Sequence, residues 1–485
     1  MSMENSQPKD EEPIRPETSS ISIAIVGGGV IGLIVAHGLL QIGVRVTIYE
    51  RASNFHEVGA GISFPKVARD CMTRLSPAVI EAMERVGLRN NHEFDYYWDG
   101  YHTRRNSASS DADRNIINDT DPEGTSCDLL FKRTNRKLDY WGCLRADFLD
   151  NLAASLPPDV THFNKQFTAY TDPSPSAGPV TLHFSDGTSA TADAIIGCDG
   201  LRSRVRAQLL ASTAPEAILP TYSHQRCYRA VVARSATESV IGQEKASRRC
   251  AHIGPGAHVM SYPVNDSLVN LIFFHADANP WPHTRHLTLP GKREDIVNAV
   301  EGWSSAVRGL VSLFPKEPLV WGLFDMYEHP APSYVEPGQG GRVCIAGDSA
   351  HASTPHHGAG AAMGVEDALA LTTVVKLVVE KLEVARTGSG DERESLGSLM
   401  EVKAKCLASA LKTFSDVRYE RSQWLVKSSR EGGLIFNWRY PGSMDDPVEI
   451  QRELDERLDK IWTFDIEGMV DEVRSRFSDA FDGVK

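Results

Sequence analysis

Three closely spaced glycines near the start of the chain have the spacing that binds a dinucleotide. They are Gly27, Gly29 and Gly32. They lie between an apolar run at 21–26 and a helix-like segment at 31–40, so a pyrophosphate can approach the backbone at a helix N-terminus. Glu50 comes two residues after the next apolar run, 44–48, where a carboxylate accepts hydrogen bonds from a ribose. This pattern predicts a site for an ADP moiety without distinguishing FAD from NAD.

Two later segments carry a glycine and aspartate pair directly after a short apolar run. Asp199 precedes Gly200 after the run 194–196, and Asp348 follows Gly347 after the run 343–346. Beyond Asp348 the chain forms a Pro-x-x-Gly-x-Gly pattern, whose members are Pro355, Gly358 and Gly360. In order and spacing these segments resemble the fingerprints of the aromatic hydroxylase family of flavin monooxygenases.

That resemblance implies FAD as the bound cofactor. Asp348 then matches the aspartate that holds the ribityl chain, and the Pro355 to Gly360 turn opens a helix beneath the isoalloxazine ring. A helix N-terminus there stabilises the negative charge of a reduced flavin. Asp199 belongs to the second fingerprint, and Arg145 matches the family's FAD-contacting arginine. NADPH or NADH would serve as co-substrate with molecular oxygen, although the sequence has no second glycine-rich motif for it.

A narrower resemblance spans nearly the whole chain. It is to fungal hydroxylases that oxidatively dearomatise polyketide phenols on routes to tropolones, azaphilones and sorbicillinoids. The matching segments are Tyr222-Ser223-His224, Tyr228-Arg229, Gly254-Pro255, 258–264, Trp424 and Ile461-Trp462. The resemblance implies that Arg229, His258 and Tyr262 hold and activate the phenol.

The residues themselves support the same three positions. With two-residue alternation, Arg229 points with Cys227 and Val231, while His258 and Tyr262 share a strand face with Met260. Polar groups on otherwise apolar strand faces usually have a function or a hydrogen-bond partner. The alternatives to a role in substrate binding are a structural ion pair for Arg229 and a hydrogen-bonded position in the core for His258.

A flavin C4a-hydroperoxide delivers an electrophilic oxygen, which a phenolate attacks better than a phenol. Arg229 would stabilise the phenolate, Tyr262 would donate a hydrogen bond, and His258 would move or orient the proton. Attack at a ring carbon that bears an alkyl group gives a hydroxylated dienone. Attack at a ring carbon that bears hydrogen gives a catechol, and attack at one that bears a carboxylate releases carbon dioxide. The resemblance favours the first outcome, in fungal secondary metabolism. Tyr140 lies where another phenol could reach the cavity.

His351, His356 and His357 cluster within seven positions. No carboxylate or cysteine joins them at ligand spacing, so we expect no metal site. We expect His356 and His357 to line the flavin and substrate cavity instead.

The elements that must position these residues predict an α/β fold. A Rossmann-like FAD-binding domain is interrupted by an antiparallel substrate sheet with strands at 225–234, 258–264 and 268–275. An amphipathic helix at 366–384 and a surface loop at 386–398 follow. The expected division is a disordered tail 1–20, an FAD-binding domain 21–205 and 338–390, a substrate domain 206–337 and a helical region 391–485.

Composition narrows the functional classes. The net charge of -13 repels polyphosphates, so we expect no nucleic-acid partner. The eight cysteines show no metal or disulfide spacing, and residues 1–20 lack the features of a signal peptide. No run of about 18 apolar residues occurs, so we expect a cytoplasmic protein without membrane contact.

Other functions remain open at this point. The nearest is a salicylate hydroxylase-like enzyme that decarboxylates as it hydroxylates, and a more distant one is a non-catalytic flavin-binding protein. A simple NAD dehydrogenase would leave Asp199 and Asp348 unexplained. A flavin halogenase lacks its Trp-x-Trp-x-Ile-Pro segment, and a squalene epoxidase-like membrane enzyme lacks its apolar C-terminal helices.

Overall fold

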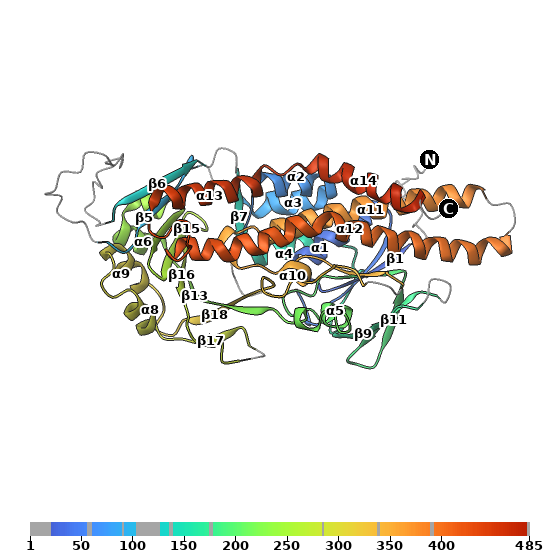
Figure 1. Ribbon diagram of the computed structural model, residues 1–485, viewed down its shortest axis with the longest axis horizontal. Coiled ribbons are helices and arrows are strands. Elements are labelled where there is room, and N and C mark those ends of the chain that lie inside the picture. Colours follow the sequence, from blue (N-terminus) through green and yellow to red (C-terminus); the bar gives the residue numbers. More distant parts are fainter. Residues whose placement is uncertain are drawn as a thin grey trace, which may run out of the picture.

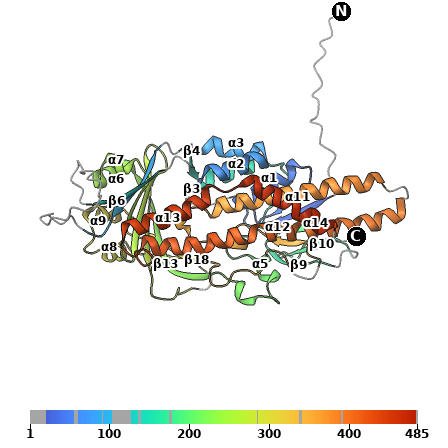
Figure 2. The ribbon, with the colours of Figure 1, turned by 45° about the horizontal axis from the view of Figure 1, so that its top comes forward.

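The protein is elongated, with a parallel sheet toward one end and a larger, mainly antiparallel sheet toward the other (Figure 1). The computed structural model describes residues 21–55, 61–89, 92–102, 127–134, 139–173, 178–283, 286–336, 340–388 and 392–482. Long helices run beside both sheets and project past the parallel one (Figure 2). The tail predicted for 1–20 lies outside the described residues.

The parallel sheet forms because its strands are apolar on both faces, which suits burial between two layers. Its strand order is β19-β12-β1-β2-β8, and all neighbours are parallel. The strands are β1 (Ser22–Val26), β2 (Arg45–Tyr49), β8 (Thr161–His162), β12 (Ala194–Gly197) and β19 (Val343–Ile345). The four apolar runs predicted as strands of one sheet are confirmed, including two that arrive from far along the chain.

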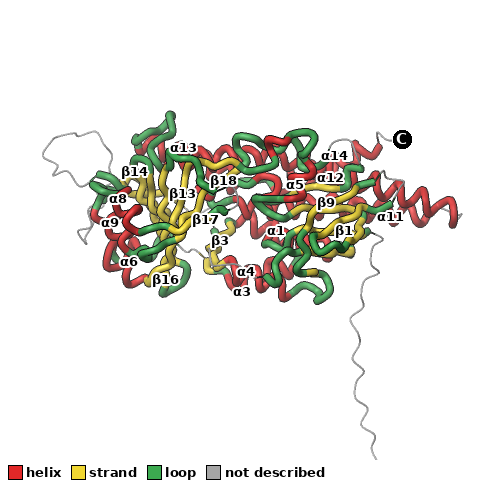
Figure 3. Tube along the Cα trace, turned by 90° about the horizontal axis from the view of Figure 1, so that it is seen from below, coloured by secondary structure: helices red, strands yellow, loops and turns green. Residues whose placement is uncertain are grey.

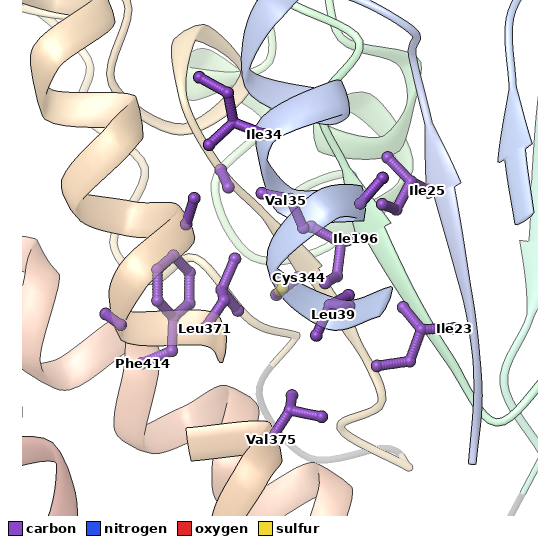
Figure 4. Packing of buried hydrophobic residues seen from close by; sticks show 14 of the residues in the cluster. Ile23, Ile25, Ile34, Val35, Leu39, Ile196, Cys344, Leu371, Val375 and Phe414 are labelled. Atoms are coloured by element: carbon purple, nitrogen blue, oxygen red, sulfur yellow. The ribbon is translucent and has the colours of Figure 1, made fainter. Parts of the chain in front are cut away.

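Helix α1 (Val30–Gln41) packs one face of this sheet against α11 (Gly360–Gly388) (Figure 4). Its Leu39 lies between Ile23 of β1 and Leu371 of α11, and its Val35 lies beside Ile196 of β12. A Cβ atom at Gly32 would lie 2.1 Å from the carbonyl oxygen of Gly27, so the close approach of helix and strand requires glycine. The predicted β-α-β unit is therefore present.

A three-stranded antiparallel sheet, β11-β10-β9, adds to the same core. Its strands are β9 (Phe167–Thr171), β10 (Val180–Phe184) and β11 (Ser189–Ala192). The rings of Tyr49 and Phe184 lie 4.7 Å apart and join the two sheets. Shorter helices complete this half of the molecule: α2 (Lys66–Leu75), α3 (Pro77–Val86), α4 (Arg145–Ala154), α5 (Arg204–Leu209) and η2 (Pro215–Ala217).

The second large sheet has eight strands in the order β17-β18-β13-β16-β15-β14-β5-β6 (Figure 3). They are β5 (Phe94–Asp99), β6 (Leu129–Thr134), β13 (Thr221–Ala233), β14 (Cys250–Gly254), β15 (Ala257–Pro263), β16 (Leu268–Ala276), β17 (Thr288–Pro290) and β18 (Leu319–Asp325). The outer face is covered by α6 (Arg234–Ile241), α7 (Gln243–Ala246), α8 (Arg293–Ala299) and α9 (Ser305–Ser312). The three strands predicted here, and the hairpin at 265–267, are confirmed.

A division of the chain at residue 205 does not account for two of these strands. β5 and β6 come from the first part of the sequence, yet β5 pairs with β14 in parallel. An antiparallel three-stranded sheet joins the two halves: β3 (Gly61–Phe64), β7 (Trp141–Leu144) and β4 (Leu88–Arg89).

The C-terminal part is helical, as predicted: α12 (Glu392–Phe436), α13 (Pro447–Trp462) and α14 (Ile466–Asp482). The surface loop predicted for 386–398 is wrong, because α11 extends to Gly388 and α12 begins at Glu392. The amphipathic pattern predicted for 366–384 holds only in its second half, since residues 362–372 are buried on every side. The first half of α11 lies between α1 and α12, which explains the difference.

A buried charge cluster joins α11 to α12. Asp367 and Arg418 form a 2.9 Å ion pair, and Arg418 also lies 2.8 Å from Glu366. His351 donates to Asp367 at 2.5 Å, and the backbone N–H of Gly347 donates to the same carboxylate at 3.0 Å. Burial opposes ionisation of Asp367, but these partners hold the pKa of its carboxyl below its usual value. The cluster thereby fixes the turn at Gly347.

Replacing Arg418 by leucine should leave two buried carboxylates under-compensated. We expect Arg418→Leu to lower the free energy of unfolding by roughly 3–5 kcal/mol, measured by guanidinium unfolding. Arg452 is a matched control, because its ion pairs lie on the surface of α13, where solvent screens them. Equal unfolding midpoints for Arg418→Leu and Arg452→Leu would contradict this role for Arg418.

Candidate active site

The N-terminus of α1 leaves room for an anionic group. Gly29 is its N-cap, with no side-chain cap and no acidic residue in the first turn. A Cβ atom at Gly29 would meet nothing within 4 Å. Beside it, Glu50 accepts hydrogen bonds from the N–H groups of Gly28 at 2.7 Å and Ala52 at 2.8 Å, which orient its carboxylate. Open space before a bare helix N-terminus, with a carboxylate near, fits the ADP moiety of FAD.

The turn that carries Asp348 is held by a buried arginine. The guanidinium of Arg206 donates to the carbonyl oxygens of Ser349 at 2.9 Å and Ile218 at 3.0 Å. Gly347 has a φ of +61°, which glycine adopts without strain. Together with Asp367, Arg206 therefore fixes the backbone on which Asp348 is presented.

Asp199 has a structural role that its motif does not reveal. Its carboxylate accepts from the N–H of Arg204 at 2.7 Å and from the hydroxyl of Ser203 at 2.5 Å, so it caps α5. The hydroxyl of Ser349 also donates to it at 3.3 Å. Asp199 thus links two distant fingerprints, and direct contact with FAD stays a prediction.

A cavity of about 780 Å³ lies between the half of the molecule that contains the parallel sheet and the half that contains the eight-stranded sheet. Seven of the predicted site residues line it: Arg229, His258, Tyr262, Asp348, Pro355, Gly358 and Gly360. Tyr140, His356 and His357 line it too, as predicted. The remaining predicted residues lie outside its wall: Gly27, Gly29, Gly32, Glu50, Arg145 and Asp199. Arg145 begins α4 directly after β7, whose Gly142 and Cys143 do line the cavity.

The register of three neighbouring strands explains how the substrate-side residues meet. Arg229 of β13 pairs with Ile272 of β16, which pairs with Met260 of β15. In the adjacent rows, His258 pairs with Phe274 and Tyr262 pairs with Asn270. Because side chains two residues apart share a face, all of these residues project from the same face into the cavity.

Arg229 brings a positive charge to this face without a carboxylate of its own. Among the described residues no Asp or Glu forms an ion pair with it, and its Nε has no hydrogen-bond partner. The guanidinium lies 5.7 Å from the ring centroid of Trp321. A structural ion pair therefore does not explain this arginine within the described part of the chain, and an anionic ligand would compensate its charge.

Tyr262 is a partly buried phenol next to two arginines. Burial raises the pKa of Tyr262, while the charges of Arg229 and Arg249 and a hydrogen bond with Asn270 partly oppose the shift. The side chain stays protonated at neutral pH, so its hydroxyl can donate a hydrogen bond. A Cβ atom at Gly61 would lie 3.4 Å from this hydroxyl, which places it near β3.

His258 is held as a neutral imidazole. It is fully buried, and its ring stacks on Phe274 with centroids 4.5 Å apart. Its Nδ1 donates to the side-chain oxygen of Asn437 at 2.7 Å. Burial lowers the pKa of His258 to about 4, although the hydrogen bond to Asn437 opposes the shift. Nε2 has no hydrogen-bond partner among the described residues.

His356 and His357 are also neutral for the same reason. Burial lowers the pKa of His357 to about 3 and that of His356 well below its usual value. Both pack closely on α12, where a Cβ atom at Gly433 would lie 2.6 Å from His356 and one at Gly432 2.9 Å from His357. In the described part of the chain, no group of three or more His, Cys, Asp or Glu residues could hold a metal ion.

Sequence reasoning missed three polar residues that matter here: Asn270 and Arg249 line the cavity, and Asn437 lies behind its wall as the partner of His258. Asn270 lies two positions from Ile272 on β16, so strand alternation could have found it. Arg249 lines the cavity and pairs with Asp95 at 3.2 Å, but nothing in its sequence context marks it. Asn437 follows α12 and reaches His258 only through the tertiary fold.

The turn that follows β19 of the parallel sheet and one face of the eight-stranded sheet line the same cavity, an arrangement that suits a flavin-dependent hydroxylase. The family described as FAD binding domain matches residues 147–384, and the one described as pyridine nucleotide-disulphide oxidoreductase matches 22–76. The chain belongs to the fungal FAD-dependent monooxygenases, and it is an oxidoreductase that binds FAD.

The relatives match along nearly their whole length. FAD-dependent monooxygenase SAT7 of Stachybotrys chartarum is 42% identical, over 95% of this chain and 92% of its own. Salicylate hydroxylase asL1 of Sarocladium schorii is 38% identical, over 96% and 92%. A solved salicylate hydroxylase substrate complex is 25% identical with a TM-score of 0.74, over 94% of this chain and 98% of that one. None of the described helices is long and apolar enough to cross a membrane.

Asp348 should contribute to FAD retention, because its carboxylate faces the cavity on a rigid turn. We expect Asp348→Ala to weaken FAD binding about 10- to 100-fold, the loss of one hydrogen bond to a charged group. Titration of apoprotein with FAD, followed by flavin fluorescence, measures the change. Asp445→Ala, in the exposed turn before α13, is the control. Equal affinities for both variants would show that Asp348 does not hold the cofactor.

Proposed function

We propose that this enzyme uses NADPH or NADH and molecular oxygen to hydroxylate an alkylated phenol, with loss of aromaticity. Bound FAD, once reduced by the nicotinamide, supplies an electrophilic oxygen atom from molecular oxygen. The observation that carries the proposal is the guanidinium of Arg229, which has no carboxylate partner among the described residues and lies on the same sheet face as Tyr262 and His258. A phenolic polyketide of fungal secondary metabolism is the substrate class that suits this arrangement.

Each of the three side chains has a separate role toward the phenol. Arg229 stabilises the phenolate, whose ortho and para carbons are the electron-rich positions that attack oxygen. The protonated hydroxyl of Tyr262 donates a hydrogen bond to a second oxygen substituent of the ring. His258 is neutral, so its free Nε2 accepts a hydrogen bond from a phenolic O–H.

The cavity wall favours an alkylated ring over a small polar one. Met260, Ile272 and Phe274 extend the sheet face, and Phe436 and Trp462 line it from the C-terminal helices. Attack at a ring carbon that already bears an alkyl group forms a C–O bond and removes no hydrogen. The phenolate oxygen then becomes a ketone, and the product is a hydroxylated dienone.

A second candidate is decarboxylating hydroxylation of a salicylate. Two observations favour it: the relative from Sarocladium schorii, which is named a salicylate hydroxylase, and a further arginine in the cavity wall, Arg249. Arg249 already pairs with Asp95, so it is less available to a substrate carboxylate than Arg229 is to a phenolate. For this reason we propose dearomatisation ahead of decarboxylation.

Product mass separates the two candidates. With NADPH, the holoenzyme should consume oxygen and convert an alkylated dihydroxybenzaldehyde into a product one oxygen atom heavier, without the absorption of an aromatic ring. The matched dihydroxybenzoate should be a poor substrate. Release of carbon dioxide from the benzoate, with the aldehyde unreactive, would establish the second candidate. A yellow holoenzyme that no phenol stimulates to oxidise NADPH would indicate a non-catalytic flavoprotein.

Arg229→Ala should separate catalysis from cofactor binding. We expect this variant to retain FAD but to lose about 10²- to 10³-fold in kcat, because it removes one preorganised stabiliser of developing charge. Steady-state oxygen consumption per bound flavin measures the loss. Arg226→Ala is the matched control, since Arg226 lies on the opposite face of the same strand and pairs with Asp277 at 3.0 Å. Unchanged turnover per flavin in Arg229→Ala would rule out this role.

A further inference from the structure

The hydrogen bond between His258 and Asn437 joins the substrate sheet to the end of α12. Nδ1 of His258 lies 2.7 Å from Oδ1 of Asn437, and both residues are fully buried. A carbonyl oxygen can only accept, so Nδ1 must carry the proton. Because the ring is neutral, Nε2 then holds a lone pair.

The position of Asn437 is fixed by how α12 ends. Trp438 adopts a left-handed conformation with a φ of +53°, and the N–H of Arg439 donates back to Leu434 at 2.8 Å. This closes the helix at Phe436. The carbonyl oxygen of Asn437 accepts from Gly256, in the turn between β14 and β15, at 2.9 Å. Asn437 is therefore anchored by its backbone to the hairpin that carries His258.

The imidazole ring itself has little freedom to turn. Phe274 stacks on it at 4.5 Å with an interplanar angle of 14°, and Phe436 lies 5.0 Å away. These contacts hold the ring with Nδ1 toward Asn437. His258 lines the cavity, and of its two ring nitrogens Nε2 is the one without a hydrogen-bond partner among the described residues. A buried acceptor without a partner is costly unless a ligand satisfies it.

We propose that Asn437 is a positioning residue that fixes the proton of His258 on Nδ1, so that Nε2 accepts a hydrogen bond from a phenolic O–H of the substrate. The inference rests on the proposed function for the identity of the ligand. Arg229 and His258 thereby distinguish two oxygens of one substrate. The ionised oxygen lies at the cation, and the oxygen that keeps its proton lies at the acceptor. This favours phenols with two hydroxyl groups over monohydroxylated rings.

The charged and titratable groups around His258 come from several elements. Those that line the cavity include His356 and His357 of η3 (Pro355–His357), Arg229 of β13, Arg249 before β14 and Tyr262 of β15, and the carboxylates of Asp266 and Asp348 line it too. The pKa of His258 is shifted by burial and by the hydrogen bond to Asn437, with no carboxylate among the causes. An amide at 437 therefore leaves His258 uncharged, and a carboxylate there would change its charge.

Asn437→Asp tests the arrangement with almost no change in volume. An opposite charge beside Nδ1 should raise the pKa of His258 by roughly 1–3 units. Below that pKa, Nε2 becomes a donor and can no longer accept from the phenol. We expect kcat/KM of the FAD holoenzyme for an alkylated dihydroxybenzaldehyde to fall about tenfold from pH 8 to pH 5 in the variant, beyond any fall in the unmodified enzyme.

A histidine-labelled sample gives a readout that needs no turnover. Nitrogen NMR of the unmodified holoenzyme should show Nδ1 protonated and Nε2 unprotonated on His258, from pH 8 to pH 5. Adding the same dihydroxybenzaldehyde should shift the Nε2 resonance. In Asn437→Asp both nitrogens should become protonated as the pH falls.

Two further variants separate positioning from mere packing. Asn437→Leu keeps the branched shape and the number of heavy atoms but offers no acceptor, so activity should fall without a new pH-dependent limb. In the double variant His258→Phe with Asn437→Asp the new limb should be absent. A protonated Nε2 in the unmodified enzyme, or an unchanged pH profile in an active Asn437→Asp, would overturn the inference. If the unmodified enzyme hydroxylates no phenol, the proposed function fails, and the NMR measurement still decides the tautomer.

Discussion

The backbone turn at Gly347 and Asp348 is clamped by two buried charged side chains. Asp367 accepts from the N–H of Gly347, and Arg206 donates to the carbonyl oxygen of Ser349. Neither partner is near the turn in sequence, and each belongs to a different layer of the fold. Buried charges are costly unless their partners are in place. This requirement brings the end of β19, the start of α5 and the helices α11 and α12 to one point, beside the open N-terminus of α1. The FAD site depends on that convergence.

The charge of the cavity also depends on which buried groups have partners. Three buried histidines face it as neutral rings, because burial lowers their pKa values. Arg249 is compensated by Asp95, whereas Arg229 has no carboxylate partner among the described residues. The sheet face therefore offers one available cation, one protonated phenol and one oriented acceptor within three strand rows. Such a face recognises an ionised hydroxyarene by charge and by the placement of its oxygens.

Local patterns were enough to predict the parallel strands, the β-α-β unit and the face shared by His258 and Tyr262, because two-residue alternation and glycine spacing depend on neighbouring residues. Predictions failed where a distant contact decides the outcome. The polar residues 386–398 predicted a loop, but most of them continue two long helices. β5 and β6 join the substrate sheet because β5 pairs with β14, and no local sequence pattern indicates this pairing. Asn437 is 179 positions from His258, so their hydrogen bond exists only in the folded chain.

The central claim is that the cavity stabilises a phenolate at Arg229. The most direct measurement is the absorption spectrum of an alkylated dihydroxybenzaldehyde bound to the oxidised holoenzyme, about two pH units below the pKa of the free phenol. Stabilisation by a buried cation of about 3 kcal/mol would offset that difference in pH. The account predicts the absorption band of the phenolate in the bound state. A tightly bound ligand with the spectrum of the neutral phenol would contradict it.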